Sequence, residues 1–129
     1  MSDTPCDLVT GATGMLGSHI AERLVGGGRR VRALVRDGGD TQFLNRLGVE
    51  IVRGDLTDPE ACERATRGVD VVYHAAAKVG DWGRWSEFQA GCIDATRNLA
   101  LASLRHAVGR FLHVSSTSAY GHPREGGPP

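Results

Sequence analysis

The stretch Thr10-Gly-Ala-Thr-Gly-Met-Leu-Gly17 decides the fold class of this chain, because its glycines Gly11, Gly14 and Gly17 recur every three residues. A short apolar run, Cys6–Thr10, precedes the stretch and predicts a buried strand, and the segment that follows predicts a helix. Glycines in such a turn let the backbone approach a pyrophosphate. The anion then lies at the helix N-terminus, where unpaired N–H groups and the helix dipole favour it. The context of strand, turn and helix favours a phosphate-binding turn over a plain tight turn.

Hydrophobic periodicity in the rest of the chain alternates between strand and helix patterns. We expect strands at Cys6–Thr10, Val31–Arg36, Val49–Arg53, Asp70–His74 and Arg110–Ser115, and helices at Met15–Val25, Thr41–Leu47, Glu60–Arg67 and Ser86–Ala107. Asp58 is expected to cap the third helix, with Pro59 at its first position. Strands and helices that alternate with short connections predict a parallel sheet with helices on its faces. The chain is therefore predicted to be an α/β protein with a Rossmann-type, doubly wound parallel sheet of five strands in the order 3-2-1-4-5.

Apolar residues also recur at helical spacing within the predicted helices. In the first helix, Leu16, Ile20 and Leu24 recur every four residues and are expected on one face. The apolar positions of the long fourth helix include Phe88, Ile93, Leu99 and Leu101.

Composition excludes several classes of protein. The apolar share of 40% and the charged share of 23% exclude a disordered tail and a coiled coil. Fifteen basic and 15 acidic residues leave no basic excess, so we expect no nucleic-acid partner and no membrane partner. The three cysteines form no CxxC pair and the five histidines have no metal-ligand spacing, so no metal site is predicted. The N-terminus has no signal-peptide pattern and no run reaches the length of a membrane span, which favours the cytoplasm.

Five motifs together resemble one family. The glycine stretch resembles the TGxxGxxG signature of the extended short-chain dehydrogenase/reductases, the NAD-dependent epimerase/dehydratase family. Four more segments follow in the same order along the chain as in the family. Gly54-Asp-Leu-Thr-Asp58 resembles the family's GDLxD, and His74-Ala-Ala-Ala77 resembles its HxAA. Thr96-Arg-Asn-Leu99 resembles GTxNL, and Val114-Ser-Ser-Thr-Ser-Ala-Tyr-Gly121 resembles VSSxxVYG. The resemblance covers essentially the whole chain and implies a nicotinamide dinucleotide as cofactor.

The residue that selects the cofactor is expected at the end of the second strand, where an acid would bind the ribose 2′-OH. Val35 stands there, followed by Arg36, and Arg32 lies in the same strand. The missing acid and the arginine favour NADP over NAD, because a guanidinium binds phosphate bidentately. A shift of one residue would bring Asp37 to the ribose instead, and Arg36 would then be a solvated charge.

The resemblance implies further cofactor contacts. From the glycine loop it implies Gly11, Thr13, Gly14, Met15, Leu16 and Gly17; from later motifs it implies Asp55, Leu56, Ala75, Ala76, Ala77 and Ser115. In this family, Asp55 and Leu56 match positions that contact the adenine, and the alanines match a loop that passes over the cofactor. The alternative for Asp55 and Leu56 is a helix-cap region and a core leucine. The alternative for the three alanines is a tight strand end.

The resemblance also implies a catalytic Ser or Thr after the fifth strand, and by register this residue is Ser116. Its hydroxyl can both donate to and accept from a substrate oxygen; the alternative is a turn residue that satisfies backbone groups. The family's catalytic tyrosine, with a lysine four residues later, is absent. Tyr120 is followed at that interval by Arg124, which lies in a turn and cannot lose its proton.

Other positions depart from the family pattern or leave their role open. Cys92 replaces an asparagine that supports the proton relay in many relatives, and Ala95 replaces a glycine. Asn98 is either a member of such a relay or a polar residue facing the core. Between the fourth strand and the long helix, the tryptophans Trp82 and Trp85 either contact a substrate or pack their loop, which also holds Lys78 and Asp81.

We therefore expect residues 1–121 to form the N-terminal part of an NAD(P)-binding Rossmann domain, followed by a Pro/Gly-rich tail at 122–129. The resemblance implies hydride transfer between an alcohol or ketone carbon of a small-molecule substrate and the nicotinamide. The chain alone is expected to bind cofactor without turnover. The alternatives are a non-catalytic dinucleotide-binding sensor or subunit, and a remnant without a ligand. The fold is expected to be truncated. The fifth strand, with Phe111 and Leu112, would then form an open edge that permits a homodimer.

Overall fold

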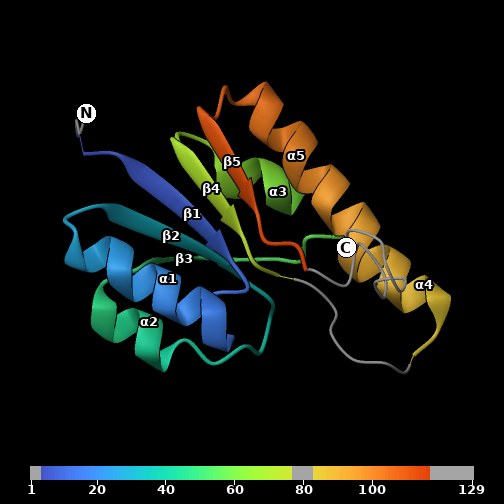
Figure 1. The fold of residues 1–129 in the computed structure, drawn as a ribbon, viewed down its shortest axis with the longest axis horizontal. Helices are drawn as coiled ribbons and strands as arrows, with labels where there is room; N and C mark the ends of the chain where they lie inside the picture. Colours follow the sequence, from blue (N-terminus) through green and yellow to red (C-terminus); the bar gives the residue numbers. More distant parts are fainter. Residues whose placement is uncertain (1–3, 77–82, 117–129) are drawn as a thin grey trace, which may run out of the picture.

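The computed structural model describes residues 4–76 and 83–116. Within them, five parallel strands form one sheet in the order β3-β2-β1-β4-β5 (Figure 1). The strands are β1 (Cys6–Thr10), β2 (Arg30–Val35), β3 (Glu50–Arg53), β4 (Val71–His74) and β5 (Arg110–His113). The predicted fold class and strand order are confirmed. Because the order reverses beside β1, the carboxyl ends of β1 and β4 border the crevice where doubly wound sheets bind ligands.

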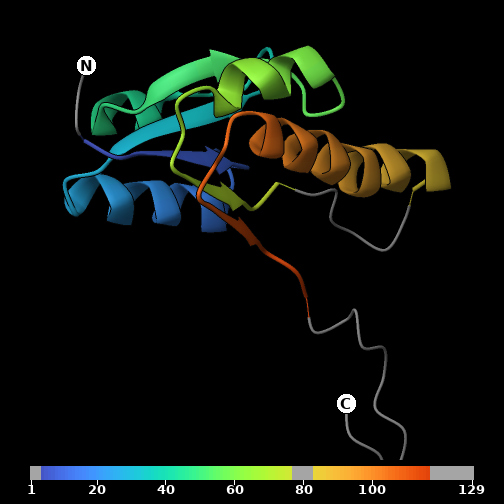
Figure 2. The same ribbon diagram turned by 90° about the horizontal axis from the view of Figure 1, so that it is seen from above.

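Helices cover both faces of the sheet (Figure 2). The helices α1 (Met15–Gly26) and α2 (Gln42–Leu47) lie on one face, and α3 (Pro59–Thr66) and α5 (Ala95–Arg105) lie on the other. A short helix α4 (Trp85–Phe88) and a π-helix (Gln89–Asp94) lead directly into α5. This layered arrangement gives the sheet an apolar core on each side.

The central strand β1 explains how the two cores form. All five of its residues are buried. Leu8 belongs to the core under α3 and α5, whereas Val9 belongs to the core under α1 and α2. A parallel strand covered on both faces reads as a continuous apolar run, which is why Cys6–Thr10 shows no polar alternation.

Two strands end earlier than the sequence pattern suggests. β2 ends at Val35, so Arg36 lies in the loop that follows. β5 ends at His113 rather than at Ser115, although the Val114 N–H still donates to the carbonyl of His74 at 3.0 Å. Ser115 and Ser116 therefore follow the sheet and are exposed. Both corrections place the predicted functional residues in loops at the carboxyl edge.

The face of α1 that carries Leu16, Ile20 and Leu24 is only partly buried. Gly17 and Ala21 are the buried residues of this helix, while Leu16 is 50% exposed. Ile20 and Leu24 are partly buried against the core. Close packing of Gly17 on the glycine loop turns Leu16 away from the sheet, which the spacing of large apolar residues does not reveal.

The predicted long helix, Ser86–Ala107, is interrupted by the π-helix. An added residue per turn rotates the following helix relative to the preceding one, so a single 3.6-residue period does not describe the whole segment. Leu99 is fully buried, but Ile93 and Leu101 remain 42% and 45% exposed.

Local signals elsewhere agree with the structure. Asp58 caps α3, since its carboxylate accepts from the Glu60 N–H at 3.0 Å, and Pro59 begins the helix as predicted. Among the strands that the structure describes, β5 forms one edge of the sheet, as predicted, with Leu112 45% exposed. In the described residues, none of the helices combines the length and the apolar character that a membrane crossing needs.

Candidate dinucleotide-binding site

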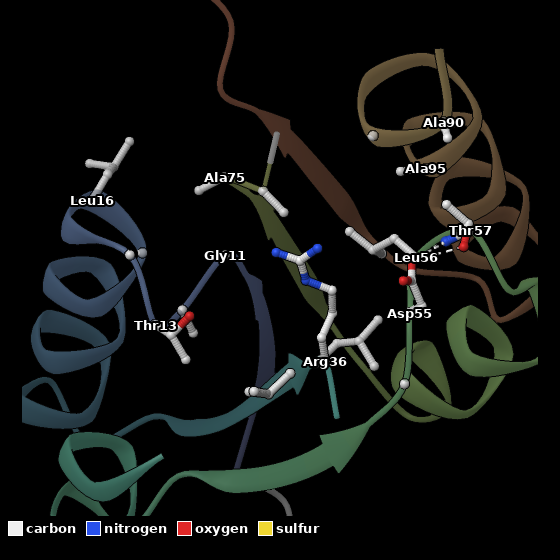
Figure 3. Close-up of a pocket in the computed structure, with 18 of the residues that line it drawn as sticks. Gly11, Thr13, Leu16, Arg36, Asp55, Leu56, Thr57, Ala75, Ala90 and Ala95 are labelled. Carbon is white, nitrogen blue, oxygen red and sulfur yellow. Dashed lines mark hydrogen bonds between the residues drawn. The ribbon is translucent and has the colours of Figure 1, made fainter. Parts of the chain in front are cut away.

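A pocket of about 720 Å³ lies at the carboxyl edge of the sheet (Figure 3). Eleven of the predicted cofactor contacts line it: Gly11, Thr13, Gly14, Met15, Leu16, Gly17, Arg36, Asp55, Leu56, Ala75 and Ala76. They come from the loops after β1, β2, β3 and β4, far apart in sequence, and the parallel sheet brings these loops together. The volume is that of a small-molecule or cofactor site.

The glycine loop is packed so tightly that side chains are excluded at two positions. A Cβ on Gly17 would lie 2.0 Å from the carbonyl oxygen of Gly11. A Cβ on Gly11 would lie 2.8 Å from the Ala76 nitrogen, and Gly11 also has a φ of +66°, which disfavours other residues. Helix α1, the glycine loop and the loop after β4 are therefore in direct backbone contact.

The N-terminus of α1 opens into this pocket. Gly14 is the N-cap residue and supplies no side-chain hydrogen bond, whereas Asp58 does so for α3. The cap therefore leaves the helix N-terminus available to an anion from outside. Met15 and Leu16, both lining the pocket, are 83% and 50% exposed, and they form an apolar rim beside the helix end.

Arg36 and Asp55 face each other across the far side of the pocket. Figure 3 shows the Arg36 side chain directed into the pocket between Ala75 and Asp55. Asp55 Oδ1 accepts from the N–H and the hydroxyl of Thr57, both at 2.9 Å. The Thr57 N–H chiefly, and the Arg36 charge to a smaller extent, hold the Asp55 pKa below its ordinary value. Asp37 is exposed and is not among the lining residues.

A buried chain of hydrogen bonds lies behind the pocket. Thr10 Oγ1 lies 2.7 Å from His74 Nδ1, and His74 Nε2 lies 2.8 Å from Thr96 Oγ1. Thr10 Oγ1 also accepts from the Ala76 N–H at 3.2 Å. His74 is 1% exposed, and this burial is the main reason why its pKa falls to about 4, with the neighbouring His113 adding to the effect. The imidazole is therefore neutral at pH 7.

The low pKa of His74 makes stability depend on pH. Below pH 6.5 the unfolded chain takes up a proton at His74 that the folded protein takes up only near pH 4. The unfolded state then binds more protons, so the free energy of unfolding falls as pH is lowered from 6.5 to 4, by up to about 3 kcal/mol. Urea unfolding at pH 7, 6 and 5 measures this slope. His74→Gln is the control and is expected to flatten the slope; equal slopes for both proteins would contradict the assignment.

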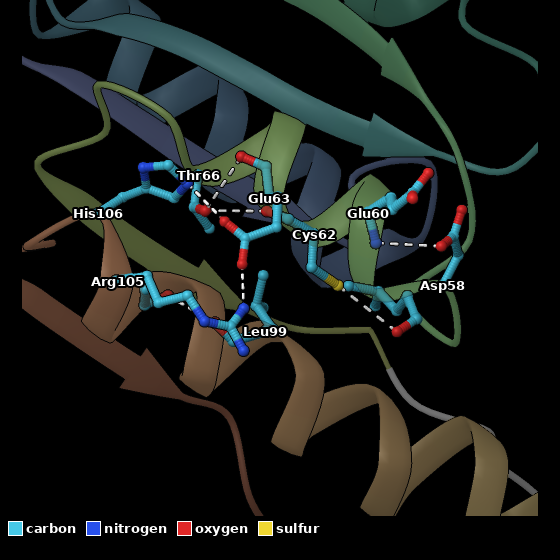
Figure 4. Close-up of polar contacts among 10 residues, drawn as sticks. Asp58, Glu60, Cys62, Glu63, Thr66, Leu99, Arg105 and His106 are labelled. Carbon is cyan, nitrogen blue, oxygen red and sulfur yellow. Dashed lines mark hydrogen bonds and ion pairs between the residues drawn. The ribbon is translucent and has the colours of Figure 1, made fainter.

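The loop after β3 is fixed to α5 through Leu56. Asn98 Nδ2 donates to the Leu56 carbonyl at 2.9 Å, so Asn98 has a structural role between two elements. Cys62 Sγ also contacts this carbonyl, at 3.5 Å, and burial raises the pKa of the Cys62 thiol to about 11. Glu63 of α3 pairs with Arg105, the last residue of α5, and with His106, which follows it (Figure 4). These contacts fix one wall of the pocket against α5.

Nine lining residues were not among the predicted cofactor contacts. Five of them lie within two residues of a predicted contact, namely Ala12, Leu34, Val35, Gly54 and Thr57, and the other four come from segments for which no contact was predicted. Glu87 comes from α4, Ala90 and Gly91 come from the π-helix, and Ala95 begins α5. The signal that could have found them is the recurrence of small residues, since small side chains at a helix start leave room for a ligand. Ala95 was noted only as a departure from the family's glycine.

Several predicted residues do not line the pocket. Ser115 and Ser116 lie past the end of β5, and neither is among the lining residues. Trp85 begins α4 and is 70% exposed, so it does not pack its loop onto the domain. Ala77, Lys78, Asp81, Trp82, Tyr120 and the tail at 122–129 lie outside the described residues.

Comparison with known proteins agrees with this geometry. The sequence model of the NAD dependent epimerase/dehydratase family matches residues 8–129. The chain belongs to this family. The match begins within β1 and includes all five motifs of the resemblance, so the family prediction is confirmed.

One curated relative and two solved structures illustrate the similarity. The chain is 38% identical to a 2-alkyl-3-oxoalkanoate reductase of Stenotrophomonas maltophilia, over 92% of the chain and 36% of the relative. Its structure is similar to the crystal structure of gox2253, with a TM-score of 0.84, 37% identity, and coverage of 98% of this chain and 38% of that one. It is also similar to WbmG of Bordetella bronchiseptica in complex with NAD, with a TM-score of 0.82, 28% identity, and coverage of 95% and 41%. The chain spans about a third of the length of the curated relatives that it matches.

Proposed function

We propose that this chain binds NADP(H) in the pocket at the carboxyl edge of its sheet. The observation that carries the proposal is the arrangement of the glycine loop, in which α1 points an N-terminus without a side-chain cap into a pocket lined by Arg36. The helix N-terminus without a side-chain cap suits a pyrophosphate, and the arginine suits a further phosphate on the adenosine ribose. Arg36 lines the pocket whereas Asp37 does not, which supports NADP over NAD.

The residues present fit such a cofactor. Glycine at positions 11 and 17 keeps side chains out of this closely packed loop, so a phosphate can approach main-chain N–H groups. Leu56 and Gly54 provide a small apolar wall beside Asp55, suited to a base. Bound there, the nicotinamide supplies the hydride chemistry, and the protein's residues bind and orient it.

For the whole protein, we propose an oxidoreductase, epimerase or dehydratase that acts on an alcohol or ketone carbon of a small molecule. Ser116, which follows the end of β5, would hold the substrate oxygen by donating or accepting a hydrogen bond. The 129 residues contain no tyrosine followed four positions later by lysine, so we expect cofactor binding without turnover from this chain alone. Buried thiols at Cys6 and Cys62 support a cytoplasmic location.

Gly14→Val tests the site directly. The φ of −83° and ψ of 175° at Gly14 suit valine, and an added Cβ would lie 3.3 Å from the Gly11 carbonyl oxygen. The fold is therefore expected to survive while the branched side chain occupies the space at the helix N-terminus. We expect affinity for NADPH to fall roughly a hundredfold, which corresponds to about 2.7 kcal/mol, or below detection, because the valine side chain occupies the space that the pyrophosphate needs. Fluorescence titration with NADPH measures the loss.

Gly26→Val is the matched control, because Gly26 ends the same helix with open space around it. This variant is expected to bind NADPH like the wild type. If Gly14→Val bound NADPH as tightly as the wild type does, the glycine loop would not be the pyrophosphate site.

Arg36→Met tests the choice of cofactor. Hydrogen bonds to a charged group are worth about 1.5–3 kcal/mol, so losing them is expected to weaken NADPH binding roughly tenfold or more while NADH binding changes little. Parallel titrations with both cofactors provide the measurement, and Asp37→Asn is the comparison. A wild-type preference for NADH that Asp37→Asn abolishes would overturn the NADP assignment.

A further inference from the structure

We propose that Thr96 is a positioning residue for dinucleotide binding, which acts through His74 and Thr10 to hold the Ala76 backbone against the glycine loop. This inference rests on the proposed function, since it concerns the same pocket. None of the three side chains is among the residues that line the pocket, so their effect is exerted from behind its walls.

The three side chains form one continuous chain of hydrogen bonds. Thr96 Oγ1 lies 2.8 Å from His74 Nε2, and His74 Nδ1 lies 2.7 Å from Thr10 Oγ1. The Thr10 hydroxyl oxygen then accepts from the Ala76 N–H at 3.2 Å. Both Thr10 and His74 are almost fully buried, at 0% and 1% exposure, so water does not replace a lost partner readily.

Each member of this chain is the sequence neighbour of a pocket-lining residue. Thr10 precedes Gly11, His74 precedes Ala75, and Thr96 follows Ala95. This series of hydrogen bonds thus joins three walls of the pocket, namely the glycine loop, the loop after β4 and the start of α5. Three hydrogen bonds fix the relative positions of these walls.

The positions of these walls affect dinucleotide binding because the glycine loop and the loop after β4 are in close contact. An added Cβ on Gly11 would lie 2.8 Å from the Ala76 nitrogen and 2.9 Å from the Ala75 carbonyl carbon. A shift of the Ala75–Ala76 backbone therefore presses on the glycine loop or opens a gap beside it. Either displacement changes the surface that the dinucleotide must match.

The series of hydrogen bonds requires the hydroxyl group of Thr96 and not its size. Valine has nearly the same shape but cannot hydrogen bond, so Thr96→Val leaves His74 Nε2 without this partner. Serine keeps the hydroxyl and loses only a methyl group. The pair of variants therefore separates the hydrogen bond from packing.

Both variants of the 129-residue chain are titrated with NADPH and NADH. We expect Thr96→Val to weaken binding of both cofactors roughly tenfold, which corresponds to the loss of one buried hydrogen bond, and Thr96→Ser to bind within about twofold of the wild type. Amide hydrogen exchange without cofactor provides a second readout. The Ala76 amide is expected to exchange faster in Thr96→Val and at the wild-type rate in Thr96→Ser.

Wild-type affinity in Thr96→Val, with unchanged Ala76 exchange, would overturn the positioning role. An equal loss of affinity in Thr96→Ser and Thr96→Val would also overturn it, because packing would then be the cause. If the proposed function were wrong, the wild-type chain itself would bind neither cofactor, which distinguishes that result from a failure of the Thr96 proposal. In that case Ala76 exchange still decides whether Thr96 holds this backbone.

Discussion

Gly17→Ala is expected to lower the free energy of unfolding by about 3 kcal/mol, near the upper end for forcing atoms into a packed site. The added Cβ would lie 2.0 Å from the carbonyl oxygen and 2.5 Å from the carbonyl carbon of Gly11. Both are backbone atoms, so no side chain can rotate away to relieve the overlap. The glycine loop must then move away from α1, and affinity for NADPH is expected to fall with stability. Urea unfolding monitored by circular dichroism measures the first effect.

Gly26→Ala is the matched control, because it makes the same substitution at the last residue of the same helix. A Cβ on Gly26 meets nothing within 4 Å, so alanine is expected to stabilise the protein slightly, by about 0.5 kcal/mol. The two substitutions are thus predicted to have opposite signs. If Gly17→Ala unfolded at the urea concentration of the wild type, the close packing of α1 on the glycine loop would be incorrect.

Arg29→Met is expected to destabilise the protein by about 3 kcal/mol, the lower end of the loss seen when one partner of a buried ion pair is removed, because the Arg29 side chain is 33% exposed. Asp7, in the central strand β1, is fully buried. The Arg29 guanidinium donates to both of its oxygens, Nη2 to Oδ1 at 2.5 Å and Nε to Oδ2. The same contact raises the Arg29 pKa further above its ordinary value. Without Arg29, the Asp7 carboxylate keeps the cost of its burial and loses this compensation.

The double variant Asp7→Leu/Arg29→Met removes both charges, and it is expected to recover most of the lost stability. Glu50→Gln provides a comparison at the surface. Glu50 pairs with Arg32 at 3.0 Å but its side chain is 56% exposed, so a change below about 1 kcal/mol is expected. A loss in Arg29→Met no larger than that in Glu50→Gln would show that the Asp7 carboxylate is not buried as described.

Sequence alone predicts the parts of this molecule that depend on short-range patterns. Glycines at positions 11, 14 and 17 can occur together for few reasons, and the alternation of apolar runs predicts the strand order. Asp58 followed by Pro59 identifies a helix start, because capping and the missing proline N–H are local effects.

Contacts between distant segments escape such patterns. The sequence places His74 in a family motif but does not show its partners, because its role depends on Thr10 and Thr96, which are 64 and 22 residues away. The role of Asn98 likewise depends on a carbonyl group 42 residues away. The π-helix interrupts the long helix and contributes Ala90 and Gly91 to the pocket, which no periodicity predicts.

Residue-resolved NMR titration of the wild-type chain with NADPH tests the central claim most directly. Saturable shifts are predicted at the backbone amides of Gly11, Gly14 and Ala76, together with the amides around Asp55. NADH is predicted to shift the same glycine-loop amides at higher concentration. Absence of saturable shifts with both cofactors, or shifts confined to a remote surface such as that around the exposed Leu104 of α5, would contradict the account.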